Sequence, residues 1–281
     1  MFLDATTAVG IVFSILCILL PIIVLAVFIP YKIIQSKYTS FVKAHSVAIK
    51  ELNDINLNYK FREVTNLVLE QSYDTESMYR DLLPSDYLVH YLSYNHKAVS
   101  NQLNDSLYNK NLYEDYIKRV NEIKGFGIFD IEETPKNQKK LEKIDEKLFK
   151  SQIQKPNRNF SIKVTLILTN IEKKPLTRKS MSFDAKYIKD IINRLKNRRG
   201  YFYLDNEIWN SITKVERAKV SNRMRFAIYK RDNNRCRMCG RSTGDLEIDH
   251  IIPIAKGGKS TYDNLQTLCK RCNQAKGSKI L

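Results

Sequence analysis

The amino-acid sequence predicts an α+β protein made of four successive parts, and three observations lead to this fold class. Residues 6–30 form an uncharged apolar run, residues 160–169 largely alternate apolar and polar side chains, and two Cys-x-x-C pairs lie near the C-terminus. They predict an N-terminal transmembrane helix, a small unit of β-hairpin and helix, and a zinc-stabilised C-terminal domain. A helical region is expected between the transmembrane helix and the β-hairpin unit. The expected parts are residues 1–31, 32–124, 125–200 and 201–281.

The apolar run is dominated by Ile, Leu, Val, Phe and Ala. About 25 residues make a helix of about 37 Å, which is enough to cross a hydrocarbon core. A cleaved signal peptide is disfavoured, because Asp4 but no Lys or Arg precedes the run and no clear small-x-small site follows it. A buried core helix is the other interpretation, but such helices are rarely so uniformly apolar. We therefore expect an uncleaved anchor with a kink at Pro21.

Flanking charge predicts the orientation of this anchor. Lys32, Lys37 and Lys43 follow the run, whereas Asp4 precedes it. Because positively charged flanks stay on the cytoplasmic side, we expect a single-pass membrane protein with its N-terminus outside and all later residues in the cytoplasm. Membrane lipid is then one expected partner.

The strongly basic composition points to a polyanionic partner. The 281 residues carry a net charge of +17, which favours nucleic acid, acidic lipid or both. Residues 213–281 contain sixteen Lys or Arg against six Asp or Glu, the concentration that binding along phosphates requires. Charged helices are also often only solvated faces. The leading DNA-binding candidates are Arg217, Arg223, Arg225, Lys230 and Arg231.

Residues 38–124 show apolar side chains near helical spacing, and Pro84 with Asp86 marks a helix start. We expect long antiparallel helices. Their Tyr and Leu stripes fit either a core or a dimer seam, so a homo-oligomer through this region is left open. The pattern identifies neither partner proteins nor a trigger. His45, His90 and His96 are interpreted as structural or surface residues.

The region 125–200 begins where Gly125 and Gly127 interrupt the helical pattern. A lysine-rich stretch with helical spacing, a segment in which apolar and polar side chains largely alternate, and turn residues then follow in order. The expected elements are a charged helix over 136–150, a strand over 160–169, a turn at 173–175, a return strand over 178–183, and a helix capped by Asp184 and ended by Gly200.

Four cysteines form two pairs, Cys236 with Cys239 and Cys269 with Cys272. Two such knuckles supply four thiolates, which fits a tetrahedral structural zinc site. Four unrelated thiols are the alternative interpretation. The remaining Cys17 lies in the apolar run, so no cysteines are left for a disulfide framework, which suits a reducing compartment.

Between and after the knuckles, the sequence predicts a strand over 246–253, a glycine loop, a second strand over 264–269 and a helix over 272–279. The run DHIIPIAKGG…YDNLQTLCKRCNQAKG resembles the HNH endonuclease family, whose fold is ββα-metal. The resemblance covers about fifty residues and includes the knuckles, the Asp-His pair, the loop Asn and the CN..KG ending.

The resemblance implies a role for each motif residue. His250 would be the general base, and Asp249 with Asn273 would ligate a catalytic divalent ion. Asn264 would brace the loop and orient His250. Asn273 stands where the family often has His, and the resulting all-oxygen set favours Mg²⁺ while leaving the metal's identity open. Lys276 and Arg231 would contact phosphate.

The function implied is a membrane-anchored DNA endonuclease with a single-metal, histidine-base mechanism and weak sequence preference. A role in defence against phage or other incoming DNA follows from the anchor, although DNA uptake or turnover would look the same. Two alternatives remain open at this stage. They are a membrane-tethered DNA-binding or sensing protein with a non-catalytic HNH fold, and an exported nuclease toxin.

Overall fold

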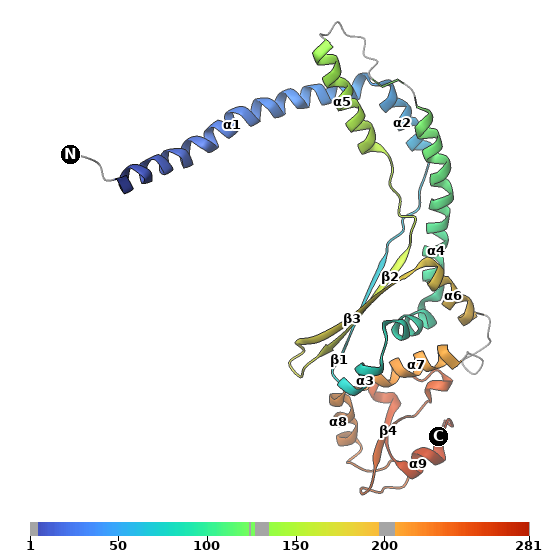
Figure 1. Cartoon of the computed structure of the whole chain (residues 1–281). Coiled ribbons are helices and arrows are strands. Elements are labelled where there is room, and N and C mark those ends of the chain that lie inside the picture. The colour runs from blue at the N-terminus through green and yellow to red at the C-terminus, as the bar shows by residue number, and fades with distance from the viewer. Residues whose placement is uncertain (1–4, 124, 127–134, 197–205, 281) are drawn as a thin grey trace. The chain divides into compact units, whose positions relative to one another are not determined.

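The computed structural model describes residues 5–123, 125–126, 135–196 and 206–280 (Figure 1). The chain divides into two compact units. Unit 1 comprises Met1–Phe61 and Asn111–Lys155, and unit 2 comprises Arg62–Lys110 and Pro156–Leu281. The mixed α+β content agrees with the sequence, and the candidate site lies within unit 2.

The N-terminal apolar run belongs to α1 (Ala5–His45), a helix of 41 residues. This helix continues without a break through the segment that carries Lys32, Lys37 and Lys43. Within the described ranges, no helix combines the length and the apolar character that bilayer crossing demands. The predicted transmembrane anchor and its single-pass topology are therefore wrong, and the cytoplasmic placement and lipid partner derived from them lose their support.

Unit 1 is helical and comprises α1, α2 (Val47–Asn58), α5 (Pro135–Gln152) and the C-terminal part of α4 (Pro84–Glu122). Ser46 separates α1 from α2: its Oγ accepts from the backbone N–H of Ile49 at 3.2 Å and donates to Asp145 Oδ1 at 2.6 Å. Apolar side chains from these helices form its core, among them Val42, Leu52, Tyr116, Leu141 and Phe149. These stripes agree with the core interpretation, and the dimer seam stays a prediction.

Unit 2 contains a three-stranded sheet of β1 (Leu67–Tyr73), β2 (Ser161–Thr169) and β3 (Pro175–Asp184) in that order. The alternation in β2 and the turn after it form the expected antiparallel hairpin with β3. Strand β1 lies in the region expected to be helical and pairs parallel with β2. Its half-buried and exposed residues alternate, and pairing with a strand about ninety residues later outweighs local helical preference.

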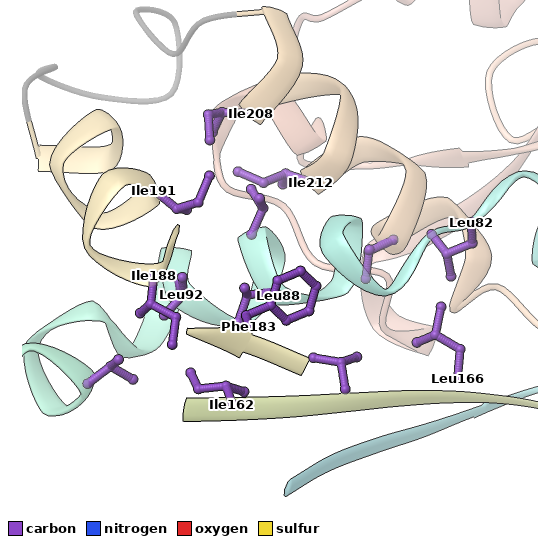
Figure 2. Packing of buried hydrophobic residues seen from close by; sticks show 14 of the residues in the cluster. Leu82, Leu88, Leu92, Ile162, Leu166, Phe183, Ile188, Ile191, Ile208 and Ile212 are labelled. Carbon is purple, nitrogen blue, oxygen red and sulfur yellow. The ribbon is translucent and has the colours of Figure 1, made fainter. Parts of the chain in front are cut away.

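Helices α3 (Glu76–Asp81), α4, α6 (Ala185–Lys196) and α7 (Asn206–Ala218) complete this part of unit 2. Asp184 Oδ1 accepts from the backbone N–H of Tyr187 at 2.8 Å, so the expected cap of α6 is present. The helix end expected at Gly200 and the break at Gly127 lie outside the described residues. Figure 2 shows the buried side chains that the sheet and helices share, including Leu88, Leu92, Ile162, Leu166, Phe183, Ile188, Ile191, Ile208 and Ile212.

The C-terminal part of unit 2 follows α8 (Asn222–Arg231). It consists of β4 (Leu246–His250), two 3₁₀ turns at Ile254–Lys256 and Tyr262–Asn264, β5 (Leu265–Cys269) and α9 (Lys270–Lys276). Strands β4 and β5 pair antiparallel, with Asp249 opposite Gln266 and His250 opposite Leu265. This arrangement is the ββα order that the sequence predicts. The structure ends β4 at His250, so both motif residues lie at the end of a strand.

Candidate active site

The four knuckle cysteines converge on one point. Their sulfur atoms all lie within 4.8 Å of one another, and Cys239 Sγ lies 3.8 Å from Cys269 Sγ. Tetrahedral zinc with Zn–S bonds of about 2.3 Å requires sulfur–sulfur distances of about 3.8 Å. The cluster therefore fits the predicted structural zinc ion. Leu246 and Leu268 pack against it, so the metal would organise both strands.

The thiols of this cluster compete for protons. Hydrogen bonding to Cys269 and burial raise the pKa of Cys272. Burial also acts to raise the pKa of Cys236, but hydrogen bonds from the backbone of Cys269, Cys239 and Met238 lower it overall. Because a thiol must lose its proton to bind a metal, a cluster in which one thiol has a lowered pKa is suited to bind a cation.

Arg231 joins the end of α8 to the second strand. Its guanidinium donates to the backbone oxygen of Leu265 at 2.7 Å, to that of Tyr262 at 2.9 Å, and to the carboxylate of Asp232. Asp232 in turn accepts from the backbone N–H of Thr267 at 2.8 Å. Arg231 thus has a structural role. Its internal contacts occupy guanidinium N–H donors that a phosphate contact would need.

The loop between the strands is held by Asn264. Its Oδ1 accepts from the backbone N–H of Ile252 at 2.8 Å, and its Nδ2 donates to the oxygens of Ile252 and Lys259. A Cβ on Gly258 would lie 1.8 Å from the oxygen of Ile252, so this close approach requires glycine. Asn264 braces the loop, but the ring of His250 has Ser260 as its hydrogen-bond partner.

Asp249, His250 and Asn273 line one cleft of about 380 Å³. Asp249 Oδ2 accepts from Gln266 Nε2 at 3.2 Å and lies 3.1 Å from Lys276 Nζ. Residues from outside the ββα unit complete the lining, including Trp209, Thr213, Arg217 and Arg225.

The oxygen donors of the cleft fit a hard divalent cation. Asn273 Nδ2 donates to Glu247 Oε2 at 2.6 Å, which orients the amide with Oδ1 as its remaining ligand atom. Glu247 and Asp249 are two residues apart on β4 and so share a face. A carboxylate and an amide oxygen from two residues that line the cleft form a set that suits Mg²⁺ or a similar ion. Glu247 was not anticipated from the sequence.

His250 is partly buried, and its Nε2 lies 2.8 Å from Ser260 Oγ. Burial lowers the pKa of His250, while the negative charges of Asp249 and Glu216 oppose that shift. The neutral imidazole is therefore the main form near neutral pH, and only the neutral ring can accept a proton.

The six expected DNA contacts separate into three groups. Arg217 and Arg225 line the cleft. Arg223 and Lys230 are exposed but are not part of that lining. Arg231 and Lys276 are engaged in internal contacts, and Lys276 is 1% exposed. Residues of α7 also line the cleft, and the sequence signal that could have indicated them is Trp209, the single Trp of the chain. Nothing in the local sequence marks Glu216 or Ser260.

The four clustered thiols, the ββα order and the cleft lined by Asp249, His250 and Asn273 define a ββα-metal type of site with a zinc-knuckle-like cysteine cluster. Residues 236–279 match the model of the HNH endonuclease family. A stretch of 57 residues is 40% identical to the CRISPR-associated endonuclease Cas9 of Corynebacterium diphtheriae, covering 19% of this chain and 5% of that protein. No solved structure matches the chain. The C-terminal segment is thus an HNH endonuclease domain, as its motifs predict.

Proposed function

We propose that this protein is a metal-dependent DNA endonuclease that hydrolyses phosphodiester bonds at the cleft of Asp249, His250 and Asn273. The observation that carries the proposal is that these three residues line one cleft, together with the family match over the same residues. The alignment with the Cas9 protein covers 19% of this chain and 5% of that protein. The proposed activity of the whole protein therefore rests on the cleft.

In this proposal His250 removes a proton from the attacking water, since its partly buried ring is neutral near pH 7. Asp249 and Asn273 would hold the divalent ion, which would neutralise charge developing on the leaving oxygen. Glu247 fixes the amide of Asn273, and Gln266 fixes the carboxylate of Asp249. A zinc ion held by the four cysteines would keep the two strands and α9 in register.

Arg217 and Arg225 supply the positive wall of the cleft, because both line it and neither has an ion pair among the contacts described. Guanidinium groups at these points bind the phosphates on either side of the scissile bond. We expect weak sequence preference, because phosphate contacts carry no base information.

A role in defence against phage or other incoming DNA is favoured by the CRISPR-associated relative and no longer by a membrane anchor. One contact favours the alternative of a non-catalytic DNA-binding protein. Lys276 places a buried ammonium group 3.1 Å from Asp249 Oδ2, and this charge competes with a cation for the same carboxylate.

Cleavage of supercoiled plasmid by the purified full-length chain tests the proposal. Nicking or linearisation should require a divalent metal and should be lost in His250→Ala. The matched control is His45→Ala, which alters an exposed histidine of unit 1. Zinc content should equal that of the parent in both variants. DNA binding without cleavage under Mg²⁺, Mn²⁺, Co²⁺ and Ni²⁺ would favour the non-catalytic alternative.

A further inference from the structure

A chain of short hydrogen bonds leads from α7 to the ring of His250. Ser260 Oγ lies 2.8 Å from His250 Nε2, and the same hydroxyl donates to the backbone oxygen of Glu216 at 2.6 Å. The backbone N–H of Ser260 donates to Glu216 Oε2 at 2.8 Å. Ser260 thus makes two hydrogen bonds to Glu216. Glu216 lies before the segment that matches the HNH family.

Glu216 is itself held firmly. It is 0% exposed, and its Oε1 lies 2.5 Å from His90 Nε2 on α4 and 2.9 Å from Lys219 Nζ. A buried carboxylate is tolerated only when donors surround it, and here three groups do so. The anchor for Ser260 is therefore built by α4 and α7.

The number of hydrogens decides the state of the ring. A serine hydroxyl has one hydrogen and two lone pairs, and that hydrogen points to the backbone oxygen of Glu216. Ser260 Oγ can then meet His250 Nε2 only as an acceptor, so Nε2 must carry the proton. In the neutral ring, Nδ1 is left with the lone pair.

We propose that Ser260, anchored by Glu216, is a positioning residue that holds His250 in the Nε2–H tautomer with Nδ1 as the basic atom. This inference rests on the proposed function of His250 as general base. It places part of the catalytic support outside the HNH segment, on helices that the family match does not include. Within this hydrogen-bond network of His90, Glu216 and Ser260, the serine is the residue that contacts the ring.

Steady-state cleavage by three variants tests the role. Ser260→Ala removes the hydroxyl but keeps the backbone N–H bond to Glu216, and it should lower kcat by about 10- to 100-fold with little change in KM, as lost support of a functional histidine does. Ser260→Thr keeps a hydroxyl and should recover most of that loss. Ser211→Ala is the control, because Ser211 is equally buried and bonds Asp86 Oδ1 at 2.7 Å, yet it does not contact His250.

Unchanged kcat in Ser260→Ala, or equal losses in Ser260→Ala and Ser211→Ala, would overturn the positioning role. If His250→Ala also cleaves like the parent, the proposed function itself fails, which is a distinguishable result. Nitrogen-15 NMR of the unmodified zinc-loaded protein at about pH 8, above the usual histidine pKa, needs no variant. We expect the Nε2–H tautomer for His250, and an Nδ1–H tautomer would refute the proposal.

Discussion

Lys276 Nζ lies 3.1 Å from Asp249 Oδ2 and donates to the backbone oxygen of His250 at 2.8 Å, although the residue is only 1% exposed. One ammonium group thus contacts both residues of the Asp-His pair. The sequence motif predicts that Lys276 contacts phosphate, but these two internal contacts account for its burial. Its charge balances Asp249 and holds the end of β4 against α9.

Lys276→Met should therefore destabilise unit 2 rather than simply weaken DNA binding. Removing one member of a buried ion pair leaves Asp249 unpaired, at a cost of about 3–5 kcal/mol. The fluorescence of Trp209, the single tryptophan, reports urea unfolding of unit 2. The control Lys279→Met alters an exposed lysine three residues later and should stay within about 0.5 kcal/mol. A loss of DNA affinity with unchanged stability would instead return Lys276 to the surface role.

Zinc loading should depend on the four knuckle cysteines alone. Cys236→Ser removes a buried ligand, so the purified protein should lose most of its zinc, and the ββα segment should become sensitive to protease. Cys17→Ser is the matched control, because Cys17 is exposed and outside the cluster. Metal analysis and limited proteolysis measure both. Full zinc content in Cys236→Ser would contradict the four-sulfur site.

Glu216 should make stability depend on acidity. Burial acts to raise the pKa of Glu216, but hydrogen bonds from His90, Lys219 and the backbone of Ser260 lower it well below its usual range. A depressed pKa in the folded state adds stability above the unfolded value of about 4.5, and that stability is lost as the pH falls below it. The unfolding free energy of the parent should thus decline between about pH 5 and pH 3.

Comparison of Glu216→Gln with Glu207→Gln isolates this contribution. Glu207 is exposed and lies on the same helix, so its replacement should leave the acid dependence intact. Glu216→Gln should be less stable at pH 7, and the gap to the parent should narrow as the pH falls. Because thiolates also bind protons in acid, zinc content is measured at each pH. Parallel curves for parent and Glu216→Gln would show that this carboxylate does not titrate as argued.

The arginines of the cleft wall should contribute phosphate contacts one by one. In a His250→Ala background that prevents cleavage, Arg217→Ala and Arg225→Ala should each weaken DNA binding and reduce the slope of log K against log salt by about 1. Arg223→Ala, an exposed arginine outside the cleft lining, is the control with a smaller expected change. Fluorescence anisotropy at several salt concentrations measures this. Equal slopes for all variants would show that the DNA does not contact Arg217 and Arg225.

The apolar run predicts a membrane anchor from composition alone, whereas no described helix is long and apolar enough to span a membrane. In the structure the run is part of α1, which extends to His45. The region after it was expected to be wholly helical, yet Leu67–Tyr73 forms a strand. Its parallel partner is β2, and a parallel pairing requires a distant segment that local propensity cannot supply.

The sequence by itself determined the zinc knuckles, the β-hairpin and the ββα order around Asp249, His250 and Asn273, because all depend on spacing within a few tens of residues. Only the tertiary structure decided which groups support His250. Glu216 is 44 residues from Ser260 and 126 residues from His90. A buried carboxylate finds its donors through the packing of whole helices, and side chains that meet in this way leave no periodic or motif signal along the chain.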